Sequence, residues 1–147
     1  MRRIKRDTQY ERLVQSLTSG DLAVFREIWR LLTFAALLGY RLKSKVPIGE
    51  SDPGKAIQIN YFENNPSFRG LLYLIGIIET DDTKCLQSGE EADELLLSLF
   101  EEYANGGLKY LSEVVGEGSD PFGRILGICM KLGVPEPSVP EVDFGLI

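Results

Sequence analysis

Apolar residues recur at intervals of three and four along most of the chain, and this spacing constrains the fold more than any other feature. Side chains at such intervals share one face of an α-helix, so each segment must bury that face against another element. Residues 7–17 and 22–38 show the pattern first, and the second half of 22–38 is apolar on most sides. We therefore expect residues 22–38 to form the central core helix.

Capping signals predict further helices over residues 66–80, 88–104, 108–115 and 119–132. Two of these helices have a proline in the first turn, where the missing N–H costs nothing. A Ser-x-x-Glu capping box at Ser88 opens another, because each of its side chains satisfies a free backbone N–H of the other. Glycine favours the left-handed conformation that often ends a helix, so helix ends are predicted at Gly39, Gly106, Gly116 and Gly133.

Residues 56–62 alternate apolar and polar side chains, which is typical of a strand, and residues 46–48 are their possible partner. The predicted fold class is mainly α: a compact bundle of about five to six helices, with at most one short β-hairpin around residues 46–62. Residues 1–133 are expected to form a single helical domain with a basic N-terminal arm at residues 1–6. Residues 134–147 contain three prolines and are expected to form an extended tail.

The 147 residues include no histidine, which removes the commonest general base and the commonest metal ligand. Glu79, Asp81 and Asp82 are close in sequence, but they lack the spacing of an EF-hand calcium loop. No catalytic, cofactor-binding or metal-binding residue is assigned, no cofactor is expected, and we expect that the protein is not an enzyme. The apolar runs are too short to cross a bilayer and two cysteines make no disulfide framework, so a cytoplasmic location without a membrane partner is expected.

Charge is distributed unevenly along the chain. Residues 1–45 hold ten Lys/Arg against four Asp/Glu, whereas the remaining residues hold six against eighteen. Basic side chains bind phosphates without reading sequence, so two clusters are candidate nucleic-acid contacts. They comprise Arg2, Arg3, Lys5 and Arg6 in the arm, and Arg41, Lys43 and Lys45 after the core helix. A pI near 4.8 and the lack of aromatic residues among these basic ones argue against nucleic acid as the main partner.

Three stretches, residues 34–48, 70–76 and 100–108, together resemble a known family. The most specific of them is the string Glu-Glu-Tyr-Ala-Asn-Gly-Gly-Leu at residues 101–108. In this order they resemble DNA phosphorothioation-associated protein 4, also called Dnd system-associated protein 4. The resemblance covers roughly residues 3–116, and the segment past Gly116 lies outside it.

Genes of this family occur beside the bacterial machinery that places sulfur in the DNA backbone, or beside its restriction partner. The resemblance therefore implies an accessory protein of DNA phosphorothioate modification or of an anti-phage defence system, and it brings no catalytic residues. We expect a non-enzymatic adaptor that contacts other proteins of such a system, and a homo-oligomer is compatible with this role. The alternative is a DNA-binding accessory that uses the N-terminal arm and the Arg41–Lys45 loop. A metal-dependent hydrolase or nuclease built on the Glu79 cluster is the least favoured.

Overall fold

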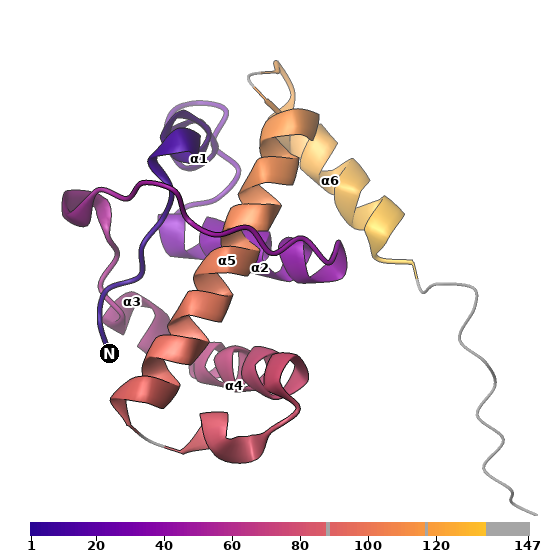
Figure 1. Cartoon of the computed structure of the whole chain (residues 1–147). Coiled ribbons are helices and arrows are strands. Elements are labelled where there is room, and N and C mark those ends of the chain that lie inside the picture. The colour runs from indigo at the N-terminus through magenta and orange to yellow at the C-terminus, as the bar shows by residue number, and fades with distance from the viewer. Residues whose placement is uncertain (88, 117, 135–147) are drawn as a thin grey trace, which may run out of the picture.

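A computed structural model of the chain describes residues 1–87, 89–116 and 118–134. Within them the chain forms six α-helices, three short 3-10 helices and no β-sheet, which confirms the predicted mainly α bundle. The longest helix, α5 (Glu90–Val114), runs through the middle of the molecule. Helices α2 (Ile28–Arg41) and α4 (Pro66–Thr80) cross it at different heights (Figure 1).

The remaining helices surround this crossed set. Helix α1 (Glu11–Thr18) packs against α2, the short α3 (Asn60–Glu63) leads into α4, and α6 (Pro121–Leu132) lies beside the C-terminal part of α5 (Figure 1). The 3-10 helices are η1 (Thr8–Tyr10), η2 (Pro53–Lys55) and η3 (Thr83–Leu86). None of the described helices is long and apolar enough to cross a membrane.

Three phenylalanines tie α3, α4 and α5 together in the core. The ring of Phe62 lies 4.4 Å from that of Phe68 and 5.8 Å from that of Phe100, measured between centroids. All three side chains are buried, and burying a side chain of this size stabilises a fold by roughly 1.5–3 kcal/mol.

Helices α2 and α5 cross so closely that two glycines predicted as helix ends lie inside helices instead. A Cβ atom at Gly39 would lie 2.0 Å from the Tyr103 carbonyl oxygen, and one at Gly106 would lie 1.8 Å from the Ser44 carbonyl oxygen. The glycines are therefore needed for close packing and not for turns. As a result, α5 continues through Gly106 to Val114, where two separate helices were predicted, and α2 continues past Gly39.

Helix α2 also begins later than the expected residue 22. The N–H groups of Val24 and Phe25 both donate to the carbonyl of Leu17, at 2.9 and 3.0 Å. These bonds satisfy a carbonyl at the end of α1, and they hold the connection in a non-helical path until Ile28. The structure confirms both expected ends of the helix over residues 66–80, and it confirms that the last described helix ends at Leu132.

The β-hairpin expected around residues 46–62 is not formed, although all of these residues are described. Ile57 exchanges two backbone hydrogen bonds of 2.9 Å with Ile4, and a second isolated bridge joins Asp7 to Ser51. Ile4 is almost completely buried, so pairing with the N-terminal segment buries an apolar side chain that the hairpin would have left exposed. The Ser88 capping box and the predicted tail after Val134 fall outside the described residues.

Candidate functional site

The basic residues of the predicted N-terminal arm are not grouped on one free arm. Arg2 binds two carboxylates of α5, with Nε 2.7 Å from Glu94 and Nη2 2.6 Å from Glu101. Arg6 is buried and pairs with Glu11 at 2.9 Å. In contrast, Arg3 and Lys5 are exposed. The segment is therefore docked on the domain, and its contact with nucleic acid stays a prediction.

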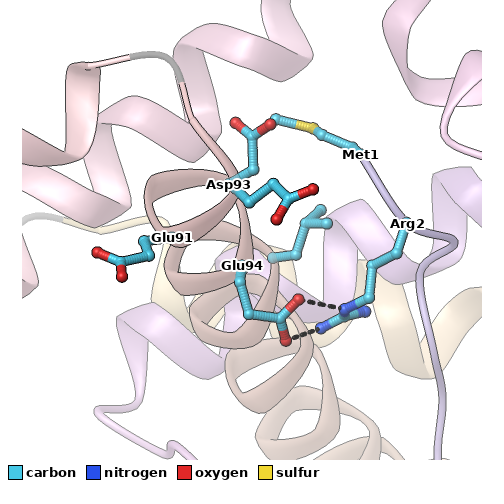
Figure 2. Close-up of a pocket in the computed structure, with 7 residues that line it drawn as sticks. Met1, Arg2, Glu91, Asp93 and Glu94 are labelled. Atoms are coloured by element: carbon cyan, nitrogen blue, oxygen red, sulfur yellow. Dashed lines mark hydrogen bonds and ion pairs between the residues drawn. The ribbon is translucent and has the colours of Figure 1, made fainter.

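Arg2 also borders an acidic pocket at the start of α5 (Figure 2). Figure 2 shows the Glu94 carboxylate facing the Arg2 guanidinium, whereas Glu91 points to the other side of the helix. The hydrogen bond from Arg2 lowers the pKa of the Glu94 carboxyl below its usual value. Acidic side chains are stabilised in the first turn of a helix by the helix dipole, so local structure accounts for this cluster.

The second predicted basic cluster does come together. Arg41, Lys43 and Lys45 line one open pocket of about 770 Å³. Lys45 Nζ lies 3.0 Å from Glu79 of α4, and Arg41 Nε donates to a backbone carbonyl at the end of α6 at 3.2 Å. The pocket thus lies where the ends of α2, α4 and α6 meet.

Two tyrosines also line this pocket, which corrects the expectation that no aromatic residue accompanies the basic ones. Tyr40 lies in the last turn of α2 beside Arg41, and Tyr103 reaches the same place from α5. Their ring centroids are 5.7 Å apart in an edge-to-face arrangement. We call the site formed by Tyr40, Tyr103, Arg41, Lys43 and Lys45 the tyrosine–lysine pocket.

Two residues that line the tyrosine–lysine pocket, Tyr103 and Glu79, are hydrogen-bonded to each other. The Tyr103 hydroxyl donates to the Glu79 carboxylate, and together with Lys45 it lowers the pKa of Glu79. Burial, and then the hydrogen bond to Glu79, raise the pKa of Tyr103. At neutral pH the tyrosine therefore stays protonated and the carboxyl ionised, which keeps the bond intact.

The string at residues 101–108, the most specific part of the family resemblance, holds the basic loop in place. The Val46 N–H donates to the Glu102 carbonyl at 3.0 Å. The side-chain amide of Asn105 donates to the carbonyls of Val46 and Pro47, at 3.2 and 3.0 Å. Sequence reasoning missed this role because the string was interpreted as a helix end.

The acids Glu79, Asp81 and Asp82 have separate structural roles. Glu79 faces the tyrosine–lysine pocket, Asp81 closes α4 in a left-handed conformation with φ 51°, and Asp82 accepts the Lys84 N–H at 2.9 Å at the start of η3. Over residues 1–87, 89–116 and 118–134, no group of three or more His, Cys, Asp or Glu side chains is placed to hold a metal ion.

Two helices present apolar side chains to solvent. On α4 these are Leu74, Ile77 and Ile78, which we call the α4 face. On α6 they are Phe122, Leu126 and Met130, which we call the α6 face, and Met130 is 69% exposed. The sequence alone could not show which helix faces neighbouring elements would leave uncovered.

Gly127 lies on the solvent side of α6, next to the α6 face. A Cβ atom at this position would have no neighbouring atom within 4 Å. Glycine inside a helix is less stable than alanine by roughly 0.5–1 kcal/mol. No contact within the described chain requires glycine here, whereas a partner packed closely on α6 would.

Comparison with known protein families gives a match. Residues 3–145 match the family described as DNA sulphur modification system-associated protein 4. The match extends past Gly116, where the resemblance judged from the sequence ended, so α6 lies within it. No curated protein and no solved structure matches the chain. The match covers well over half of the chain, which therefore belongs to the family of DNA sulphur modification system-associated protein 4.

Proposed function

We propose that this protein is a non-enzymatic adaptor of a bacterial DNA phosphorothioate modification or restriction system. It acts through protein contacts made by the α4 face and the α6 face. The observation that carries this proposal is that two separate helices each expose a row of large apolar side chains. The family description supplies the context, because it associates the chain with a DNA sulphur modification system.

Single exposed apolar residues are common on proteins, but clusters of them typically mark a surface for a partner. Leu74, Ile77 and Ile78 lie within one turn and a half of α4, and no charged residue occurs between Arg69 and Glu79. The α6 face follows the i, i+4, i+8 spacing of one helical stripe. Two such faces on separate helices allow the protein to hold two partners, which is the work of an adaptor.

The α6 face is free of charged side chains. Arg124 and Lys131 are the only charged residues between Pro121 and Leu132, and both are cationic. At 3.6 residues per turn they lie roughly 140–160° around the helix from the centre of the α6 face, so this face itself is uncharged. A partner that presents an apolar surface of its own would therefore fit this face.

The test is co-purification with the proteins encoded in the same gene cluster. We expect the wild-type chain to retain a partner, and we expect Leu74→Glu or Leu126→Glu to lose it. Both leucines are exposed, so either change should alter the stability of the free protein by no more than about 0.5 kcal/mol. Tyr61→Glu, at an exposed residue of α3 that belongs to neither face, is the control and should retain the partner.

Two results would contradict the proposal. One is that no protein of the gene cluster is retained by the wild-type chain. The other is self-association of the purified protein that Leu126→Glu abolishes, because this would make the α6 face a homo-oligomer interface. Sedimentation velocity at micromolar concentration distinguishes the second result.

A further inference from the structure

The tyrosine–lysine pocket departs in charge from the rest of the protein. The whole chain carries a formal net charge of −6. In contrast, the described residues that line this pocket include three cations and one carboxylate, that of Glu79. A local excess of positive charge on an acidic protein attracts an anionic ligand to that place. Its volume of about 770 Å³ is within the range of pockets that hold small organic groups.

Lys43 adopts a backbone conformation in which glycine is the favoured residue. Its φ is 54°, in the left-handed region. It sits just after the end of α2, where its N–H donates to the Tyr40 carbonyl at 3.1 Å and the Ser44 N–H donates to the Gly39 carbonyl at 2.8 Å. These two bonds form the Schellman motif that glycine usually completes. The chain therefore places a long cationic side chain at a position where the backbone conformation favours glycine. Strain of this kind is found at functional sites.

Tyr40 provides an accessible aromatic surface beside Lys43. Its side chain is 39% exposed, and it packs edge-to-face on the buried Tyr103. Tyr103 is in turn fixed by its hydrogen bond to Glu79, and Glu79 by Lys45. The Tyr40 ring is thus held on a rigid support. A rigid aromatic ring among cations is the chemistry that binds an unpaired nucleotide, because any base can stack on the ring while the cations meet the phosphates.

We propose that the tyrosine–lysine pocket binds single-stranded DNA, with one unpaired base against Tyr40 and the neighbouring phosphates at Lys43 and Arg41. Base pairs in an intact duplex are stacked on one another, so the ring of Tyr40 reaches a base only where the strand is unpaired. An acidic peptide would satisfy the cations but would leave the ring without a partner. The family description favours DNA over RNA, and the pocket is separate in its residues from the α6 face.

The experiment is fluorescence anisotropy of the full chain with a labelled oligonucleotide of about 20 nucleotides, its duplex, and labelled polyglutamate. We expect the single strand to bind more tightly than the duplex or polyglutamate. Binding should weaken as salt rises, because phosphate contacts release counterions. No binding of the single strand at 50 mM salt, or equal binding of polyglutamate, would overturn the proposal.

Two lysine variants distinguish binding at the pocket from non-specific electrostatic attraction to the rest of the surface. Lys43→Gly should weaken binding and reduce the slope of log affinity against log salt by about 0.7, the share of one phosphate on a single strand. Because glycine suits the backbone there, the same change should raise the melting temperature by roughly 3 °C, so lost binding cannot reflect unfolding. Lys109→Ala removes an exposed lysine of α5 and is the control. We expect it to have a smaller effect on the affinity and on the salt slope.

Substitutions at Tyr40 test the stacking step. Tyr40→Leu should weaken single-strand binding about tenfold, because base–aromatic stacking is lost. Tyr40→Phe keeps the ring and should bind as the wild type does. Equal affinities of the Leu and Phe variants would exclude stacking on Tyr40, and an unchanged salt slope in Lys43→Gly would exclude a phosphate at Lys43.

Discussion

The backbones of α2 and α5 are in contact at Gly107. A Cβ atom there would lie only 1.9 Å from the Ala35 carbonyl oxygen. At Gly127 of α6 the same atom would meet nothing within 4 Å. Both residues sit inside helices, so their intrinsic helix propensities are equal. Any difference between their alanine variants must therefore come from packing.

We expect Gly107→Ala to destabilise the protein by about 3 kcal/mol or more, because the helices must separate to admit the methyl group. Gly127→Ala should stabilise it by roughly 0.5–1 kcal/mol, because alanine has the better helix propensity. Urea unfolding of both variants at pH 7 checks the pair. Similar changes in the two variants would contradict the close crossing.

The hydrogen bond between Tyr103 and Glu79, which supports the tyrosine–lysine pocket, can be tested by removing one hydroxyl group. Tyr103→Phe removes the donor to Glu79 and should destabilise the fold by about 1 kcal/mol, the net contribution of a typical hydrogen bond. Tyr40→Phe removes the hydroxyl of the more exposed ring and should change the unfolding free energy by no more than about 0.5 kcal/mol. Equal effects of the two changes would contradict the assigned role of Tyr103.

At the scale of elements, α4 followed from capping and helical spacing alone, because those signals are local, whereas α1 begins at Glu11 and not at the predicted residue 7, after the 3-10 helix η1. The glycines in α2 and α5 could not be interpreted locally. Gly39, Gly106 and Gly107 have the same appearance in sequence as helix ends, but their reason lies in a neighbouring helix distant in sequence. The pairing of Ile4 with Ile57 was missed for the same reason, since competition between two strand partners depends on what each one buries.

The candidate site was predictable in the same partial way. Arg41, Lys43 and Lys45 were found because they are neighbours in the sequence. Tyr103 was missed as a pocket residue because it reaches the site from another helix, 58 or more residues along the chain. A sequence also cannot show that Arg2 is paired with carboxylates, because Glu94 and Glu101 are close to Arg2 only after folding.

The N-terminal segment is the element whose docking is most easily tested. Glu101 is 5% exposed and accepts hydrogen bonds from the Arg2 guanidinium and, at 2.6 Å, from the Lys5 N–H. Arg2→Met would leave this buried carboxylate with fewer donors, so we expect a destabilisation of about 1–3 kcal/mol. Arg3→Met, at the exposed neighbouring residue, is the control and should change little. Equal stability of the two variants in urea would show that the segment is not docked through Arg2.

At the scale of the whole molecule, several carboxyls bind their protons more weakly in the folded chain than in the unfolded one. Hydrogen bonds from Arg6, Tyr103 and Arg2 lower the pKa values of Glu11, Glu79 and Glu94, respectively, below 4.5. As the pH falls below about 4.5, the unfolded chain takes up protons first, and the stability that these groups contribute is lost. At the alkaline end, the raised pKa of Tyr103 means that its contribution is present below pH 10 and is lost above it.

We therefore expect the urea midpoint to be constant between pH 5 and pH 9 as far as these groups are concerned, and to fall as the pH is lowered from about 4.5. In Tyr103→Phe the fall should be shallower, because Glu79 loses its strongest donor. Circular dichroism at 222 nm follows the transition at each pH. A midpoint that rises on acidification would contradict the assigned ion pairs.

We propose that this protein works by holding partner proteins on two uncovered helix faces. Hydrogen–deuterium exchange of the full chain, with and without a co-purified protein of the same gene cluster, tests it most directly. We predict that exchange slows in peptides from α4 (Pro66–Thr80), α6 (Pro121–Leu132) or both, and that α3 (Asn60–Glu63) exchanges as before. Protection that omits both helices, or is absent altogether, would contradict the adaptor function.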